Sequence, residues 1–128
     1  MKRIIAGLCL TLATCLSIGQ ALASEHGGGG GGNTPIKFTT NLGSNKYLQF
    51  EMLLEAAKPD AEQALAVQKP RLQHQIILLL SQLTFESLIT LKGKLELQEM
   101  IKEIANKLID ETEKTGIKEV LFASFIIQ

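Results

Sequence analysis

Residues that commonly build catalytic or ligand-binding sites are scarce in this sequence. Its 128 residues include two histidines, two cysteines, one tyrosine and no tryptophan, and aromatic residues make up 5% of the chain. Both cysteines, Cys9 and Cys15, lie in an apolar stretch near the N-terminus. A chain that loses this stretch has neither a disulfide nor a zinc thiolate site. The shortage of aromatic rings also removes the stacking platform that is usual in glycan-binding sites.

The charge balance points to no polyanionic partner. Thirteen basic residues offset thirteen acidic residues. Lys and Arg form no stripe on any predicted helix or loop, whereas nucleic-acid-binding proteins carry such a stripe along the phosphate backbone. We therefore expect no nucleic acid among the partners.

The remaining titratable residues form no motif that predicts an enzyme. His26 and His74 have no Asp or Glu at a metal-ligand spacing, and no serine lies in a G-x-S-x-G turn. Glu51 and Glu55 share one face of a predicted strand. Paired carboxylates cleave sugars in glycosidases, but the solvent face of a β-hairpin carries the same pattern. We expect no catalytic activity, no metal and no cofactor.

The first 23 residues have the order of a secretory signal peptide. Two basic residues precede an apolar stretch at positions 4–18, and an A-x-A processing site ends at Ala23. The apolar stretch is also long enough for an uncleaved membrane anchor. Polar residues within it favour cleavage.

Residues 24–35 contain six consecutive glycines, Gly27 to Gly32. Each glycine loses more backbone entropy on ordering than any other residue, so the segment predicts a flexible linker. A phosphate-binding loop needs a preceding strand and a following Lys-Ser or Lys-Thr pair, and both are missing from this segment. The folded domain is expected over residues 36–128.

Two alternating runs follow the linker. Residues 36–42 and 46–55 each alternate between apolar and polar side chains, and Gly-Ser-Asn at 43–45 is a turn signal. We interpret them as an antiparallel hairpin with one face on the core and one in water. The core residues of the second run are Leu48, Phe50, Met52 and Leu54.

Helical patterns fill the middle of the chain. Residues 61–68 are rich in helix formers, and Pro70 suits the first turn of the next helix. A long amphipathic helix is expected over residues 90–112, with Gly116 as its stop signal. The core residues predicted from helical spacing are Leu72, Ile76, Leu79, Leu80 and Leu83 in the Pro70 helix and Leu97, Ile101, Ile104 and Leu108 in the long helix.

The last segment, residues 117–128, alternates in the manner of a strand. We assign Val120, Phe122 and Ile126 to its core face. Its other face is apolar as well, which predicts a central strand or one covered on both sides. The element order β-β-α-α-α-β indicates an α+β fold with a small mixed or antiparallel sheet packed by helices.

Ile77 and Leu78 fall outside the core face of the Pro70 helix. With Leu72 at 0° and steps of about 100° per residue, they lie at about 140° and about 240°. Each exposed aliphatic side chain forgoes roughly 1.5 to 3 kcal/mol of burial. Either the long helix of the same chain or a second copy covers them. We take Ile77 and Leu78 as a candidate self-association surface.

Several short segments, taken in order, match the pattern of one family. They are FTTNL at 38–42, KYLQF at 46–50, KPRLQHQIILLLS at 69–81, TFESL at 84–88, Gly93-Lys94, and VLFASFIIQ at 120–128. Over residues 36–128 the chain resembles the periplasmic domain of the flagellar basal-body protein FliL. One family segment differs: the helix start Thr-Pro-Glu-Gly-Lys stands here as Thr90-Leu91-Lys92-Gly93-Lys94. Because a cation in the first turn opposes the helix dipole, we expect this helix to start late.

The resemblance implies a non-enzymatic protein with a fold like the stomatin-type (SPFH) domain. It also implies a homo-oligomeric ring that associates with the flagellar stator and basal body at the periplasmic face of the inner membrane and supports rotation and motility. Typical family members have a cytoplasmic N-terminal stretch and a transmembrane helix. Here three residues precede the apolar stretch and an A-x-A site follows it, so membrane anchoring stays open. The alternative is a soluble periplasmic scaffold or binding domain not dedicated to flagella.

We predict that the mature protein begins at Ser24, because the apolar stretch is diluted by polar residues and ends in a processing site. Intact-mass measurement on protein from the periplasmic fraction checks this start. Recovery of a form that begins at Met1, in the membrane fraction alone, would contradict it and indicate an anchored protein.

Overall fold

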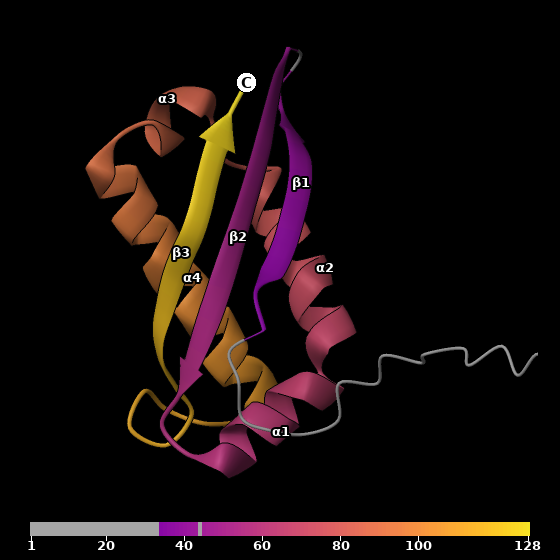
Figure 1. The fold of residues 1–128 in the computed structure, drawn as a ribbon, viewed down its shortest axis with the longest axis vertical. Helices are drawn as coiled ribbons and strands as arrows, with labels where there is room; N and C mark the ends of the chain where they lie inside the picture. The colour runs from indigo at the N-terminus through magenta and orange to yellow at the C-terminus, as the bar shows by residue number, and fades with distance from the viewer. Residues whose placement is uncertain (1–33, 44) are drawn as a thin grey trace, which may run out of the picture.

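The computed structural model describes residues 34–43 and 45–128. They form β1 (Ile36–Leu42), β2 (Lys46–Ala56), α1 (Pro59–Val67), α2 (Lys69–Leu80), α3 (Phe85–Leu88), α4 (Leu91–Ile109) and β3 (Ile117–Ile127). The strands make one antiparallel sheet, and the helices lie against one of its faces (Figure 1). The predicted α+β fold and element order are confirmed, and the four-residue α3 is an addition to them.

The predicted signal peptide and the glycine run lie outside the described residues. Within the part of the chain that is described, no helix combines the length and the apolar character needed to cross a membrane.

The hairpin of β1 and β2 forms as its alternation predicts. Phe38 lies directly opposite Phe50, and their rings stack with centroids 5.1 Å apart. Gly43 in the turn has a φ of 69°, a left-handed conformation that glycine adopts without strain. The inner face of β2 carries Leu48, Phe50 and Met52, all fully buried, and the partly buried Leu54.

The position of β3 in the sheet differs from the prediction. The strand order is β1-β2-β3, so β2 is central and β3 is an edge strand. Helices cover only one face of the sheet in Figure 1, so β3 is not covered on both sides. The apolar pattern on its two faces has another cause.

That cause is a β-bulge at Ala123. Across this point β2 advances by one residue while β3 advances by two, which leaves Ala123 without a partner in β2. An extra residue reverses the alternation beyond it. Phe122 therefore packs on the core before the bulge, and Phe125 and Ile127 do so after it. Ile126, which we assigned to the core from strict alternation, is instead 44% exposed.

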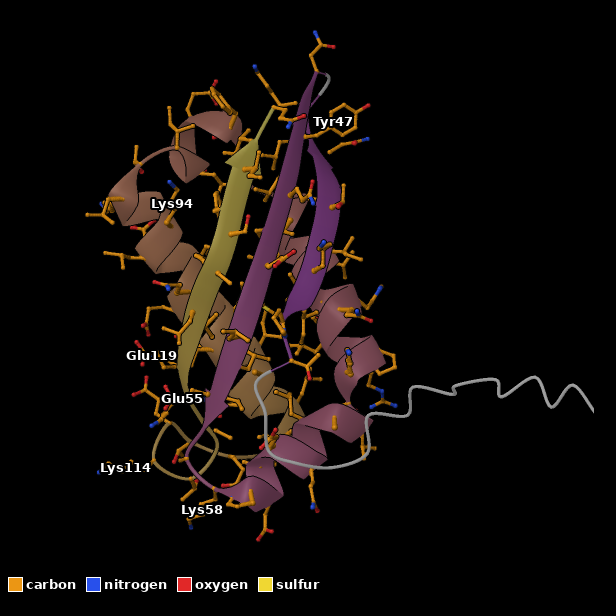
Figure 2. The ribbon with its side chains drawn as sticks, in the orientation of Figure 1. Tyr47, Glu55, Lys58, Lys94, Lys114 and Glu119 are labelled. Atoms are coloured by element: carbon orange, nitrogen blue, oxygen red, sulfur yellow. The ribbon has the colours of Figure 1, made fainter. Side chains whose placement is uncertain are left out.

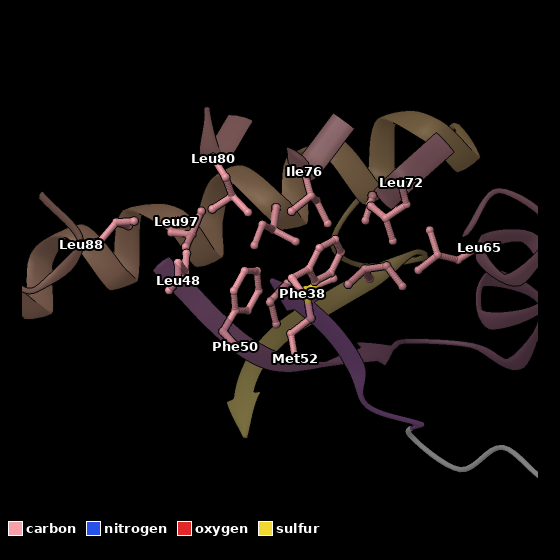
Figure 3. Packing of buried hydrophobic residues seen from close by; sticks show 14 of the residues in the cluster. Phe38, Leu48, Phe50, Met52, Leu65, Leu72, Ile76, Leu80, Leu88 and Leu97 are labelled. Carbon is pink, nitrogen blue, oxygen red and sulfur yellow. The ribbon is translucent and has the colours of Figure 1, made fainter. Parts of the chain in front are cut away.

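The core lies between the sheet and the helices, where side chains of α2 and α4 point toward those of the strands (Figure 3). The helical residues fully removed from solvent include Leu72, Ile76, Leu80, Leu97 and Ile101. Three other helical residues, Leu79, Ile104 and Leu108, are partly buried and pack against this cluster. Leu83 packs there as well, but α2 ends at Leu80, so Leu83 lies in the following loop rather than in the helix where we predicted it. Val120 of β3 is also buried.

The long helix α4 starts immediately after Thr90, so the expected late start is wrong. The backbone N–H of Gly93 donates to Thr90 Oγ1 at 3.0 Å. Such an N-cap stabilises a helix by about 1 kcal/mol, whereas a cation in the first turn costs about 0.3 to 1 kcal/mol. The cap therefore outweighs the unfavourable position of Lys92.

The end of α4 also differs from the prediction. The helix ends at Ile109 rather than near residue 112, and Asp110 adopts a left-handed conformation with a φ of 56°. Asp tolerates this conformation better than most residues, because its short polar side chain forms local hydrogen bonds. Gly116 lies beyond a further loop and does not stop the helix.

Two side chains of α4 hold this loop and the start of β3. The Asn106 amide donates to the Ile117 carbonyl at 2.9 Å, and the Ile117 N–H donates to Asn106 Oδ1 at 2.6 Å. Lys102 contacts carboxylate oxygens of Glu99 and Glu113, both at 2.8 Å. Lys102 donates hydrogen bonds to the carboxylates of Glu113 and Glu99, and these bonds, the one to Glu113 most, raise the Lys102 pKa above its usual value. Residues 110–117 are thus tied to α4 at two points, Glu113 and Ile117.

The bulge gives neighbouring residues of β3 different energetic roles. Phe125 contacts the rings of Phe50 and Phe122, with centroids 5.8 and 5.2 Å away. We predict that Phe125→Ala lowers the free energy of unfolding by roughly 2 to 4 kcal/mol, below the range for a fully buried Phe. The matched control Ile126→Ala should cost less than about 1 kcal/mol. Urea denaturation of both variants checks this order, and a larger loss from Ile126→Ala would contradict the bulge.

Candidate functional site

Both residues of the candidate self-association surface lie on the solvent side of α2. Ile77 and Leu78 are each 46% exposed. The opposite face of α2, with Leu72 and Ile76, is fully buried against the core. Although α4 packs against α2, it leaves about half of Ile77 and Leu78 in contact with solvent.

The other exposed side chains on this side of α2 are basic or neutral. Arg71 and His74 lie on the same side of α2 and are exposed. The helix contains no Asp or Glu. Across residues 34–43 and 45–128, no ion pair involves Arg71. We call Arg71, His74, Ile77 and Leu78 the α2 surface.

A second apolar area lies on the first half of α4. Leu91 is 74% exposed and Leu95 is 52% exposed, and with Met100 they line a shallow groove. The other residues of the groove are Lys92, Glu96 and Glu99. We call these six residues the α4 surface.

The sequence analysis did not find the α4 surface. The core face was defined by Leu97, and steps of about 100° place Leu91 and Leu95 roughly 120° and 160° away from it. The available signal was the same as for Ile77 and Leu78, namely large aliphatic residues on the outward side of a helix.

The acidic residues considered for catalysis lie on the sheet face that has no helices. Glu51 forms an ion pair with Lys37 at 2.9 Å, and Glu55 forms one with Lys118 at 2.7 Å. Figure 2 shows Glu55 near the start of β3 and Tyr47 at the far end of β2. The hydrogen bond that Lys118 donates to Glu55 raises the Lys118 pKa. Each carboxylate thus has a lysine on the neighbouring strand as its partner.

Metal ligands are not gathered in the described part of the chain. Within residues 34–43 and 45–128, no group of three or more His, Cys, Asp or Glu residues could hold an ion. His74 is exposed on α2, and His26 lies outside the described residues. What the described geometry offers is two apolar surfaces with charged borders, which are suited to protein contacts.

Comparison with known families gives one match. The model of the family described as "Flagellar basal body-associated protein FliL" matches residues 34–128. This range contains every strand and helix described above, including both surfaces. Comparison with curated proteins gives no match.

We predict that Leu78→Glu prevents self-association and leaves the fold intact, because a buried contact between copies does not accommodate an unpaired carboxylate. Sedimentation measures association, and circular dichroism measures folding. The matched control is Tyr47→Glu, which places the same charge at a residue that is 59% exposed on the sheet. A lower melting temperature with unchanged association would show that Leu78 is covered within its own chain.

Proposed function

Because the chain belongs to the FliL family of flagellar basal body-associated proteins, we propose that it supports the stator of the flagellar motor as a homo-oligomer. Family membership supports association with the flagellar basal body. We further propose that the oligomer lies at the periplasmic face of the inner membrane, where it aids rotation and motility.

The observation that carries this proposal is the extent of the family match together with the exposed aliphatics on α2. The match runs from residue 34 to residue 128, so it includes the whole described domain. Within that domain, Ile77 and Leu78 are large apolar residues that the other described residues leave about half exposed. A second copy would bury them.

The described residues also support a role without catalysis. FliL is a flagellar accessory family and is not known as a family of enzymes. The two strand carboxylates are engaged by Lys37 and Lys118. Export to the periplasm is supported by the signal-like order of residues 1–23.

We predict that deletion of the gene leaves flagellar filaments in place and impairs swimming, because a motor accessory acts on rotation rather than on filament export. Soft-agar spreading and cell tracking measure motility, and electron microscopy counts the filaments. The unmodified gene and the Tyr47→Glu variant should restore swimming, and Leu78→Glu should not.

Two outcomes would overturn this assignment. Unchanged motility at every load would favour the periplasmic scaffold or binding domain not dedicated to flagella. Loss of filaments would indicate a role in assembly of the basal body rather than in support of the stator.

A further inference from the structure

The helices that carry the α2 surface and the α4 surface run beside different edges of the sheet. Figure 1 shows α2 beside β1 and the first half of α4 beside β3, with the sheet in front of both. Among the residues that the structure describes, both surfaces stay exposed.

Both surfaces have the composition of a protein contact. Each has two large aliphatic residues in its centre: Ile77 and Leu78 on α2, and Leu91 and Leu95 on α4. While these side chains are exposed, the protein lacks the free energy that it would gain by removing their apolar area from water. A charged residue borders the aliphatics of α2, and several border those of α4, as polar residues do at the rim of many interfaces.

The two surfaces differ in the charged groups that a partner could meet. The α2 surface has Arg71 and no acidic residue. The α4 surface has two glutamates: Glu99 is paired with Lys102 at 2.8 Å, and Glu96 lies beside Lys92. Lys92 lies 3.7 Å from Glu96, and both side chains are largely exposed, so this contact holds Glu96 weakly. A carboxylate at this rim is therefore available to a cation of a partner.

We propose that the α2 surface of one copy packs against the α4 surface of the next, head to tail. This inference rests on the proposed function, because it takes a second copy as the partner of α2. Contact between two α2 surfaces would bring no carboxylate of that helix to Arg71 and would leave the α4 surface exposed. The head-to-tail contact covers both aliphatic pairs and joins opposite charges. Repeated from copy to copy, it builds a ring or a filament.

Two variants, each defective in one surface, test the arrangement. Leu78→Glu removes the α2 surface, and Leu95→Glu removes the α4 surface. Each variant alone should sediment as a folded monomer where the unmodified chain is oligomeric. Their equimolar mixture should form dimers that grow no further. The intact α4 surface of Leu78→Glu pairs with the intact α2 surface of Leu95→Glu, and the two surfaces left free are the altered ones. The full chain is used in a non-ionic detergent, and Tyr47→Glu should assemble like the unmodified chain.

Other outcomes separate this inference from the proposal on which it rests. If Leu78→Glu is monomeric and Leu95→Glu still assembles, α2 has another partner surface and the head-to-tail contact is wrong. A mixture that stays monomeric is equally against it. If the unmodified chain is monomeric, the homo-oligomer of the proposed function fails as well. If Leu78→Glu assembles normally, the oligomer forms without the α2 surface and only the head-to-tail contact is wrong. Leu91→Glu replaces Leu95→Glu if the latter unfolds, since an acidic residue is favourable in the first turn of a helix.

Discussion

The amide of Asn106 fixes where the last strand begins, and the rest of the sheet depends on that point. It bonds both the N–H and the carbonyl of Ile117 from within α4, and its side chain is buried. Loss of either bond would leave a buried backbone group unsatisfied, at about 1 to 3 kcal/mol each. Gly116 makes the approach possible, because a Cβ at this position would overlap with Asn106 Oδ1. Once Ile117 is placed, β3 continues along β2 to the C-terminus.

The periodicity of apolar residues predicted the strands and helices that depend on local sequence. It failed where contacts with residues distant in the sequence decide whether a side chain is buried. The hairpin and the buried helix faces follow from spacing alone, since side chains at those intervals share one side. The orientation of Ile126 depends on the bulge at Ala123, which is visible only once β3 is paired with β2. Asn106 lies about 180° from Leu97 around α4, so a helical pattern places it in solvent. The loop that buries it comes later in the chain.

In the candidate site, helical spacing indicates the outward side of a helix, and packing decides how much of that side is exposed. Ile77 and Leu78 could be found from sequence because two neighbouring aliphatics break an otherwise regular helical pattern. Leu91 and Leu95 carried the same signal, since they lie roughly 120° and 160° from Leu97 around α4. The rotation of α4 against the sheet is set by Leu97 and Ile101, which are fully buried. Buried residues thus decide which surface α4 presents.

This coupling bears on assembly as well as on stability. A contact between two different surfaces closes into a ring only if the angle between them has one value, and otherwise continues as a filament. Here α2 and α4 both pack on one core, through Ile76 and Leu97, and interiors of this density resist small rotations. The bonds from Asn106 and Lys102 further hold the second half of α4 to β3 and its loop. The core therefore sets the angle between the α2 and α4 surfaces, and with it the geometry that successive copies would follow.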